Sequence, residues 1–494
     1  MMLPNRTFLA TFALVVALAT GVAIGWTSLQ RGPWYDEFYT QYVTRADIGW
    51  GDALRTSWLP DNHPPLYYVI ARLTSGWGDL ATHRLVNVAI GAVTVALGAA
   101  VVREAPRMVP AAACAMLLLA GNTWTVIAGT ELRSYFLSLC AGGLLALALV
   151  ALWIEGNAGG PWRRTAYVLA AMAAFNTHII TTIVAGALVT PFLLTALVRR
   201  NWTLARGIGL PAAVAAIVFV ATAAVQLPYW QSNTRVFWIP AGFDAARAAI
   251  SYAVQRTLEA NLAVLALALA GLAVWARDWL RERRIAPEAV ALALLVAGTA
   301  LAAVALIGLH LVRPVIIEKY LTGLVGAIAV GVALAAGAVL AVAPRHLAVA
   351  ALIPITALSG INLAHNLQMA TARHSWFGTG QLIATEVRRC PTTVVHTDPF
   401  WNAEVMAMPP ADNRAVVPWA YRTVAREFGF AIEPAASLRL GVGCPTLFWA
   451  EHDARHAFDE ATIIAHLRAR GFALASVHLQ RIGDGWVASD RPLQ

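Results

Sequence analysis

Residues 8–29 read FLATFALVVALATGVAIGWTSL, an unbroken apolar run that is long enough to cross a lipid bilayer. A membrane-spanning helix needs about 20 mostly apolar residues. The whole chain of 494 residues is 59% hydrophobic and only 13% charged, with a mean hydropathy of +0.62. A soluble domain carries roughly twice that charged fraction. The composition excludes a disordered or collagen-like chain, argues against an ordinary soluble enzyme, and predicts a polytopic membrane protein.

Ten further apolar runs follow the first one. They lie near residues 84–102, 108–128, 134–154, 166–181, 182–198, 207–228, 259–276, 288–310, 317–342 and 347–369. Basic clusters occupy every second connection, at Arg103/Arg107, Arg163/Arg164, Arg199/Arg200/Arg206, Arg277/Arg281/Arg283/Arg284 and Arg345. Such clusters mark the cytoplasmic side, so helix orientation, and not nucleic acid binding, accounts for the net charge of +9. We expect about eleven transmembrane helices in the cytoplasmic (inner) membrane, with the amino terminus inside and everything beyond residue 370 outside.

Three segments of this topology have alternative interpretations. Ala17-Leu18-Ala19 resembles a signal-peptidase site, but a polytopic chain needs an anchor helix there. Residues 64–79 are short and interrupted by Arg72, so an interfacial helix fits better than a span. Residues 166–198 have basic clusters at both ends, which requires two short passes that turn at Asn176-Thr177-His178. A different outcome for either of the last two segments would change the helix count.

The chain changes character at about residue 370, which separates a transmembrane domain (1–370) from a small domain (371–494). In the second domain, β-rich runs at 392–396, 415–417, 446–449 and 474–479 alternate with helical patterns at 382–389, 422–428 and 463–470. This alternation predicts a small extracytoplasmic α/β domain. Cys390 and Cys444 each begin a Cys-Pro-Thr phrase that enters a strand. They either form a disulfide, which an oxidising exterior permits, or remain two free thiols.

Two adjacent carboxylates follow the first apolar run, in the stretch Pro33–Tyr39 (PWYDEFY). Carboxylates beside a membrane are costly unless they are solvated or paired. Asp36 and Glu37 therefore have two interpretations. They belong either to a solvated loop with aromatic interface anchors or to a site in which a carboxylate is held at the membrane surface as a general base.

Four further polar motifs fall in connections that the basic clusters assign to the same outer face. They are Asp61–Tyr68 (DNHPPLYY), Glu131–Tyr135 (ELRSY), Asn176–His178 and Arg313–Tyr320 (RPVIIEKY). Each has a structural interpretation: a helix start, a helix-end ion pair, an outer turn, and a basic pair that snorkels. A basic pair at the mouth of a span could instead hold a lipid phosphate. Because all of these motifs fall on the same face, one shared site is favoured over unrelated structural roles for each motif.

With these motifs, the chain resembles the GT-C superfamily of membrane glycosyltransferases. Within it, the chain is most similar to the branch of the protein O-mannosyltransferases and the aminoarabinose transferase of lipid A. The resemblance covers roughly residues 5–370. Its best marks are Asp36-Glu37 after the first helix and His63-Pro64-Pro65-Leu66-Tyr67-Tyr68 at the start of the next segment. Glu131–Tyr135 and Thr177-His178 look like later loop motifs of the family.

The resemblance implies an inverting glycosyltransferase that moves a sugar from a polyprenyl-phosphate donor to an acceptor hydroxyl on the outer face of the membrane. The acceptor would be a cell-envelope lipid, glycan or protein. Asp36 matches the family's catalytic base, and Glu37 lies beside it. Lys319, Arg133 or Arg313 would stabilise the charge that develops on the leaving phosphate. The residues expected to bind substrate are His63, Tyr35, Tyr67, Glu131, Tyr135 and His178.

One residue departs from the family pattern. Relatives often have an arginine before the tyrosine where this chain has Lys319, its only lysine. Lysine keeps the charge but lacks the bidentate fork of arginine, which makes its phosphate role less certain from sequence.

No metal is expected, because this branch of GT-C enzymes largely works without the divalent ion that many others use. Asp36, Glu37, Glu131 and His178 would form a metal site only if folding brings them together. Two other function classes compete with the enzyme. A transporter or lipid flippase should carry its charges along the spans and on both faces, and a membrane scaffold would use the exterior domain as a binding module. The gathering of polar motifs on one face favours the enzyme.

Overall fold

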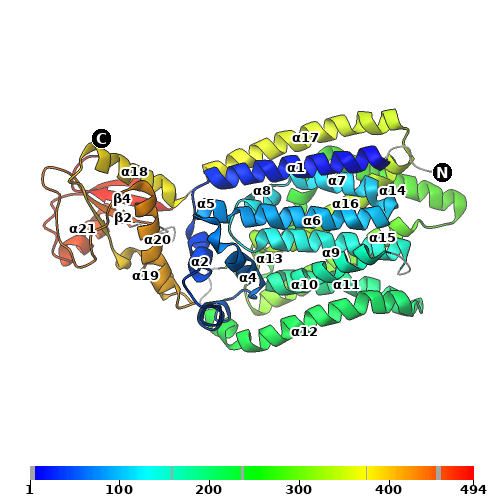
Figure 1. The fold of residues 1–494 in the computed structure, drawn as a ribbon, viewed down its shortest axis with the longest axis horizontal. Coiled ribbons are helices and arrows are strands. Elements are labelled where there is room, and N and C mark those ends of the chain that lie inside the picture. The colour runs from blue at the N-terminus through cyan, green and yellow to red at the C-terminus, as the bar shows by residue number, and fades with distance from the viewer. Residues whose placement is uncertain (1–5, 157–159, 235–238, 374, 452–457, 494) are drawn as a thin grey trace.

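The structure is a computed structural model that describes residues 6–156, 160–234, 239–373, 375–451 and 458–493. It is mainly helical, as expected, and has two parts: a long helical bundle and a small α/β domain at the carboxyl terminus (Figure 1). The last helix of the bundle is α17 (Arg345–Ala372), and the first helix of the α/β domain is α18 (Trp376–Arg389).

Nine of the described helical segments are long and apolar enough to cross a membrane. They are α1 (Arg6–Gln30), α5 (Leu80–His83) with α6 (Leu85–Glu104), α9 (Tyr135–Glu155), α11 (Ile179–Val198), α12 (Trp202–Asn233), α14 (Leu262–Glu282), α15 (Pro287–Val312), η4 (Glu318–Leu321) with α16 (Thr322–Val342), and α17. A bent pair adds a tenth if it is one broken span. This pair joins η3 (Pro106–Met108) and α7 (Val109–Gly121) to α8 (Thr123–Gly129) at an angle of 69°. The expected count of eleven is reached only by adding α10 (Pro161–Thr177), whose 17 residues lie at the lower limit for a span.

Both uncertain segments of the sequence-based topology are helical in the structure. Residues 166–198 form α10 and α11, which are separated by His178; its extended backbone (φ −155°, ψ 139°) ends the first helix, and its side chain caps the second. Residues 64–79 contain α4 (Leu66–Leu73), whose 8 residues span only about 12 Å at 1.5 Å per residue. This segment is therefore too short to cross a membrane, as expected.

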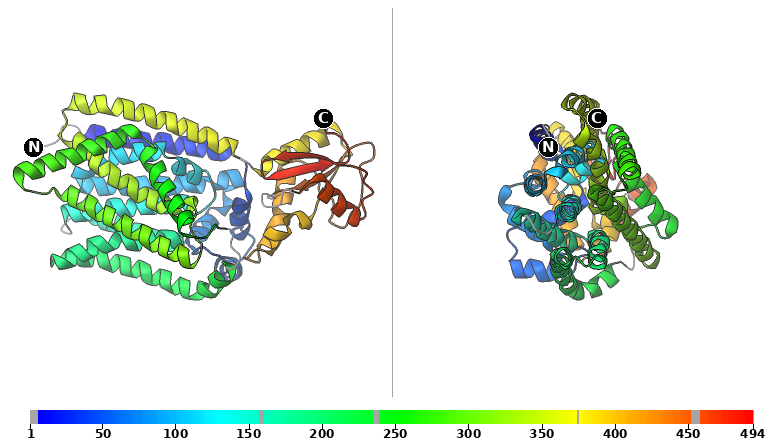
Figure 2. Two further views of the ribbon diagram at one scale, coloured as in Figure 1. Left: turned by 180° about the vertical axis from the view of Figure 1, so that it is seen from behind. Right: turned by 90° about the vertical axis from the view of Figure 1, so that its right-hand side faces the viewer.

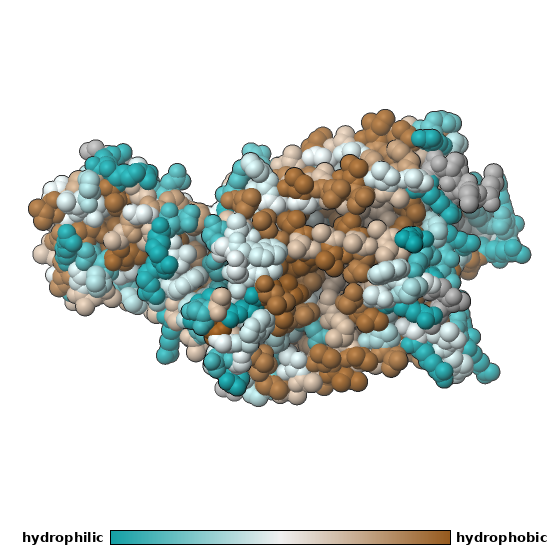
Figure 3. Space-filling view, in the orientation of Figure 1, coloured by the Kyte–Doolittle hydropathy of each residue, from teal (hydrophilic) through white to brown (hydrophobic). Residues whose placement is uncertain are grey.

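Helices α9 and α16 form the centre of the bundle, and most of their residues are buried. Their backbones touch at glycines: a Cβ on Gly142 would lie 2.2 Å from the carbonyl oxygen of Gly323, and one on Gly326 would lie 2.4 Å from that of Leu139. Small residues that allow such close approach are typical of helix packing in membranes. Apolar side chains cover the outside of the bundle, whereas hydrophilic ones gather at its end away from the α/β domain (Figure 3).

Several short helices cap the end of the bundle that faces the α/β domain. They are α2 (Tyr35–Val43), α3 (Trp50–Ala53), η1 (Leu54–Trp58), α4, η2 (Ser75–Trp77) and α13 (Phe243–Glu259). The guanidinium of Arg72 on α4 is buried and donates to three backbone carbonyls, those of Thr44, Ala46 and Ile48. It thereby fixes the loop after α2 against α4.

The α/β domain is built around a four-stranded sheet in the order β1-β2-β4-β3. The strands are β1 (Val394–Thr397), β2 (Thr446–Ala450), β3 (His478–Ile482) and β4 (Gly485–Ser489). Strand β1 pairs with β2 in parallel, with Val394 opposite Thr446, and the other two pairings are antiparallel. The fully buried strands β2 and β4 lie at the centre. The remaining elements are η5 (Pro399–Asn402), α19 (Ala403–Ala407), α20 (Asn413–Phe428) and α21 (Glu460–Ala469).

The prediction of a strand at residues 415–417 of this domain is wrong. Residues 415–417 include two β-branched valines, but they lie in α20, whose buried residues Val416, Val417, Ala420, Tyr421, Val424 and Ala425 repeat with the period of a helix. The run at 474–479 becomes a strand only from His478, and β4 was not expected. Cys390 and Cys444 form a disulfide, because the parallel pairing of β1 with β2 places the entrances of the two strands side by side.

Candidate active site

The five polar motifs meet at the end of the bundle that faces the α/β domain. Figures 1 and 2 show α2 and α4 lying between the bundle and this domain. Contacts join the motifs across large sequence separations: Lys319 reaches Asp36, Arg133 reaches Asp36 and Thr40, and the His63 ring lies 4.9 Å from that of His178. The motifs expected on a common face therefore form one cluster of neighbouring side chains.

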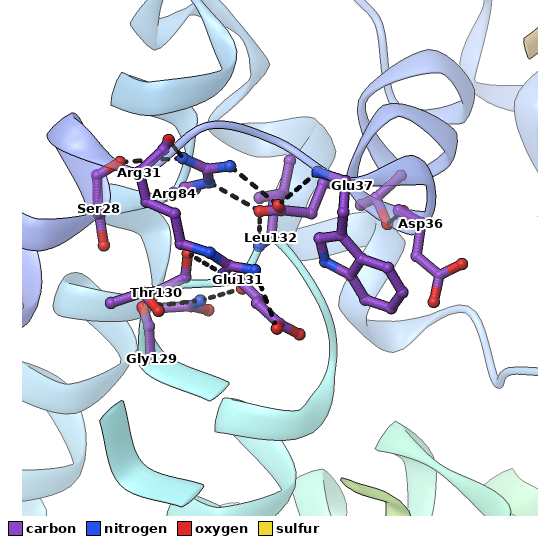
Figure 4. Close-up of polar contacts among 12 residues, drawn as sticks. Ser28, Arg31, Asp36, Glu37, Arg84, Gly129, Thr130, Glu131 and Leu132 are labelled. Atoms are coloured by element: carbon purple, nitrogen blue, oxygen red, sulfur yellow. Dashed lines mark hydrogen bonds and ion pairs between the residues drawn. The ribbon is translucent and has the colours of Figure 1, made fainter. Parts of the chain in front are cut away.

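Glu37 lies at the bottom of this cluster and is completely buried. Its two carboxylate oxygens accept from the guanidinium of Arg84 at 2.7 and 2.8 Å, and its Oε1 also accepts the backbone N–H of Leu132 at 2.8 Å (Figure 4). Burial by itself would raise the pKa of Glu37, but the charges of Arg84 and Arg31 and these hydrogen bonds outweigh it, so the pKa lies below its ordinary value. Glu37 is thus an ionised, fully paired carboxylate.

A second ion pair holds the loop before α9. Arg31 Nη2 lies 3.2 Å from Glu131 Oε1, with both side chains 1% exposed, and Arg31 Nη1 donates to the carbonyl of Thr130 (Figure 4). The side-chain amide of Asn87 donates to the carbonyl of Glu131 at 2.6 Å. Together with the bond from Leu132 to Glu37, these contacts fix the loop against the start of α2.

Helix α2 presents different side chains to its two neighbours. At its amino terminus, Glu37 Oε2 accepts the backbone N–H of Trp34 at 3.3 Å. On one side, Asp36, Glu37 and Thr40 contact residues of the bundle. On the other side, Tyr35, Phe38 and Tyr42 pack against Trp376 and Trp419 of the α/β domain.

Although both residues contact the bundle, the side chain of Asp36 points away from that of Glu37 and its partners (Figure 4). Its side chain is 28% exposed, and its Oδ2 lies 3.4 Å from Lys319 Nζ and 4.0 Å from Arg133 Nε. Lys319 also lies over the ring of Trp34, 4.3 Å from its centre, a favourable cation–π distance. Asp36 is therefore an accessible carboxylate beside two cations.

A pocket of about 290 Å³ opens beside Lys319. Its apolar lining consists of Trp124, Ile127 and Ala128 from α8 and of Ile317; polar and charged groups come from Glu131, Tyr135, Glu318, Lys319 and Arg373. A cavity that combines apolar surface with cations, here beside two carboxylates, suits a molecule that joins a hydrocarbon chain to an anionic head group.

Aromatic and histidine rings pack behind the pocket. The His178 ring lies 4.8 Å from that of Tyr320 and 6.2 Å from that of Tyr135, centre to centre.

Asp61 is buried and accepts a hydrogen bond from Tyr68, and its Oδ2 lies 3.1 Å from His63 Nδ1. Burial would raise the pKa of Asp61, but its contacts with His63 and Tyr68 and the charge of Arg133 lower it below the ordinary value.

Three predicted site residues contact other parts of the molecule. The hydroxyl of Tyr35 donates to Asn413 Oδ1 in the α/β domain at 2.6 Å. Tyr67 is buried, and its hydroxyl donates to Asn87 at 3.4 Å. Arg313 donates to the backbone carbonyl of Gln231 at the end of α12. None of the three lines the pocket beside Lys319. Of the predicted site residues only Glu131, Tyr135 and Lys319 line it, and Asp36, Glu37, His63, Arg133 and His178 do not.

Five further residues of the cluster were not predicted from the sequence: Arg31, Trp34, Arg84, Asn87 and Arg373. Arg84 and Asn87 begin an otherwise apolar span, and such polar residues at a helix start often have a buried partner. For the other three, no sequence signal distinguishes them from interface anchors. In the part of the chain that the structure describes, no group of three or more His, Cys, Asp and Glu side chains is arranged to hold a metal ion.

The sequence matches no protein-family model and no curated protein sequence. Its structure, in contrast, is similar to the crystal structure of ArnT from Cupriavidus metallidurans in the apo state, with a TM-score of 0.53 and 14% sequence identity over 98% of each chain.

The chain has the fold of ArnT. A second crystal structure, of ArnT from the same organism bound to undecaprenyl phosphate, gives a TM-score of 0.51 and 13% identity over 97% of this chain and 98% of that one. ArnT is a lipid A aminoarabinose transferase and a GT-C membrane glycosyltransferase. The resemblance inferred from the motifs is therefore confirmed for the fold, and it extends through the carboxyl-terminal domain, beyond the residues 5–370 expected from the sequence.

Proposed function

We propose that this chain is an inverting glycosyltransferase that moves a sugar from a polyprenyl-phosphate donor to an acceptor hydroxyl. The observation that carries the proposal is the position of Asp36, a partly exposed carboxylate 3.4 Å from a lysine that lines a half-apolar pocket. This arrangement supplies a proton acceptor, a cation for a phosphate and an apolar surface for a lipid. The ArnT-like fold supports the same reaction class.

The donor phosphate binds beside Lys319 and the first isoprene units lie along α8. Two observations support this arrangement: Trp124, Ile127 and Ala128 line the same cavity as Lys319, and ArnT has been crystallised with undecaprenyl phosphate. Lys319 is the first cation for the phosphate because it lines the pocket. Arg133 is the second because it contacts Asp36, whereas Arg313 contacts the end of α12 instead.

Asp36 acts as the general base. As the acceptor oxygen attacks the anomeric carbon, its proton passes to Asp36 and the bond between that carbon and the phosphate oxygen breaks. The leaving group changes from a phosphodiester to a phosphomonoester and gains negative charge, which Lys319 and Arg133 stabilise. A single displacement of this kind inverts the anomeric centre. Glu37 positions α2 and the loop before α9, because its oxygens are already occupied by Arg84 and Leu132.

The reaction takes place on the outer side of the cytoplasmic membrane. The basic clusters lie at the opposite end of the bundle from α2; for example, Arg163 at the start of α10 pairs with Glu104 at the end of α6. Basic connections mark the cytoplasmic side, which leaves the α2 end outside. The disulfide between Cys390 and Cys444 supports this orientation, because disulfides persist in oxidising compartments. The acceptor is a cell-envelope lipid, glycan or protein.

A transfer assay tests the proposal. The purified full-length chain is incubated with a panel of polyprenyl-phosphate sugars and an envelope extract, and mass spectrometry follows both the modified acceptor and the released polyprenyl phosphate. We expect the two products to appear in equal amounts with at least one donor. Movement of lipid across a vesicle bilayer without release of polyprenyl phosphate would instead identify a flippase and contradict the proposal.

A further inference from the structure

Arg373, between the last membrane helix and the α/β domain, lines the same pocket as Lys319. We infer that Arg373 binds the phosphate of the lipid donor together with Lys319, so that the segment leading into the α/β domain completes the donor site. This inference deepens the proposed function and rests on it for the identity of the lipid.

The two cations converge on one aromatic ring. Lys319 Nζ lies 4.3 Å from the centre of the Trp34 ring and Arg373 Cζ lies 5.5 Å from it. Both positive charges are therefore held near each other at the pocket, although they come from segments more than fifty residues apart. Each cation already lies beside a carboxylate, Lys319 beside Asp36 and Arg373 beside Glu131. The phosphate would be a further anion between them: the diester of the donor brings one negative charge, and the phosphomonoester that leaves brings close to two.

Arg373 is the second arginine that contacts the carboxylate of Glu131. Its Nη1 donates to Glu131 Oε1, but the same oxygen already pairs with Arg31, and that pair is 1% exposed on both sides. The Arg373 side chain remains 41% exposed. Among the described residues, its guanidinium donates only this one hydrogen bond, which leaves N–H groups for a ligand with a planar or tetrahedral set of oxygens.

The backbone is anchored before Arg373 and again from residue 375 onward. Helix α17 ends at the preceding residue, and the backbone N–H of Trp376 donates to the carbonyl of Pro33 at 2.9 Å. Gly32 lies against the same segment, since a Cβ there would come within 2.1 Å of Ser375 Oγ. This close packing presents the arginine to the pocket at a fixed place, as a binding residue requires.

A pair of matched ligands tests the inference on the purified full-length protein. Farnesyl phosphate is a phosphomonoester on a short isoprenoid chain, and farnesol is the same chain without the charge. For Arg373→Ala we expect about a tenfold or greater loss of affinity for farnesyl phosphate, the effect of losing a charge-assisted hydrogen bond, and unchanged affinity for farnesol. Arg373→Lys should recover part of the loss. The control is Arg388→Ala, an exposed arginine on α18 that donates only to Thr385 among the described residues; it should bind both ligands as the wild type does.

Three results would overturn the inference. One is equal affinity of wild type and Arg373→Ala for farnesyl phosphate. Another is an equal loss for farnesol and farnesyl phosphate, which identifies a packing defect. The third is inorganic phosphate binding the wild type as tightly as farnesyl phosphate, which excludes a lipid site. The proposed function can fail independently of this inference. If the protein binds farnesyl phosphate through Arg373 but transfers no sugar, the phosphate-binding role of Arg373 stands and the transferase activity is refuted.

Discussion

Asp36 and Glu37 are neighbours in the sequence, but their side chains meet opposite environments. Glu37 is completely buried and accepts from Arg84 and from the backbone of Leu132. Asp36 is partly exposed and faces Lys319. Consecutive residues on a helix are about 100° apart, so the helical conformation of α2 directs one carboxylate to buried partners and leaves the other partly exposed, as the proposed roles of positioning residue and base require.

Asp36→Asn should lower the transfer rate at least a hundredfold. Asparagine preserves the size of the side chain but cannot accept a proton at neutral pH, and general-base catalysis contributes about 10²–10⁴ in rate. Steady-state turnover with a saturating lipid donor measures the effect. The thermal midpoint and binding of undecaprenyl phosphate, measured on the same preparation, should stay near wild-type values. Wild-type turnover in this variant would show that Asp36 is not the general base.

Glu37→Gln should lower the stability of the protein more than it lowers the transfer rate. It leaves the buried Arg84 without its counter-charge, and breaking a buried ion pair in this way costs about 3–5 kcal/mol. The thermal midpoint in detergent should fall clearly, whereas that of Asp36→Asn should not. In the double variant Glu37→Gln/Arg84→Met, the loss should be smaller than the sum of the two single losses, because no uncompensated charge remains. An unchanged midpoint in Glu37→Gln would refute the structural role.

The same residue predicts a pH effect. Because the pKa of Glu37 is lowered in the folded protein, its contribution to stability is present above the ordinary carboxyl pKa and is lost as the pH falls through the folded-state value. The wild-type thermal midpoint should therefore fall more steeply on acidification below that ordinary value than the midpoint of Glu37→Gln. Parallel midpoint curves for the two proteins would argue against an ionised Glu37.

At the scale of elements, α2 joins the two parts of the molecule. Its side toward the bundle carries Asp36 and Glu37, and its other side packs Phe38 against Trp376 and Trp419 of the α/β domain. The turn before α2 lies against residues 375–377. The position of the carboxylates therefore depends on how the α/β domain is seated.

Gly32→Ala tests this dependence. The new methyl group would lie 2.1 Å from Ser375 Oγ and 2.9 Å from Phe377 Cβ, so the segment before α18 must move away from α2. We expect a tenfold or greater loss of turnover, by analogy with the large cost of displacing positioned catalytic groups by about 1 Å. Gly32→Ala/Ser375→Gly should recover part of it, since the nearest obstructing atoms are gone.

The matched control is Gly21→Ala on α1, where a Cβ meets nothing within 4 Å. It should keep wild-type turnover. If Gly32→Ala also keeps it, the α/β domain does not control the position of α2.

At the scale of the whole molecule, charge and hydropathy are divided along the bundle axis. Hydrophilic surface gathers at the end away from the α/β domain (Figure 3), where Arg163 pairs with Glu104. The polar motifs contact one another at the end that faces the α/β domain, and apolar surface lies between the two ends (Figure 3). This distribution favours a transferase with one outward site over a transporter, whose charges should continue along the spans.

Cysteine labelling with a membrane-impermeant maleimide tests the orientation. Asp47 and Phe400 are exposed at the α2 end and on the α/β domain, and Arg284 is exposed after α14 at the other end. Asp47→Cys and Phe400→Cys should be labelled on intact cells, and Arg284→Cys only after permeabilisation. The background needs only Cys114 and Cys140 replaced, because Cys390 and Cys444 are bonded to each other. The reverse labelling pattern would place the site in the cytoplasm.

The sequence by itself determined the class of protein, the approximate spans and the face on which the polar motifs lie. Hydrophobic runs of bilayer length and alternating basic connections are local features of the chain. They can therefore be recognised without knowing how the helices pack. The break at His178 and the short helix α4 followed from the same length arguments. The strand expected at 415–417 failed because local β-propensity was overridden by burial of one side of α20.

Only the tertiary structure decided what each polar residue contacts. The pairs Glu37–Arg84, Arg31–Glu131 and Lys319–Asp36 join segments 47 to 283 residues apart, and nothing in the local sequence sets such partners. The same holds for Arg373, which looks like an ordinary basic residue after a span until the fold places it beside the pocket. Charged groups in a protein of this kind are held by long-range partners, because burial near the membrane makes an unpaired charge costly; the partners therefore appear only once the helices are packed.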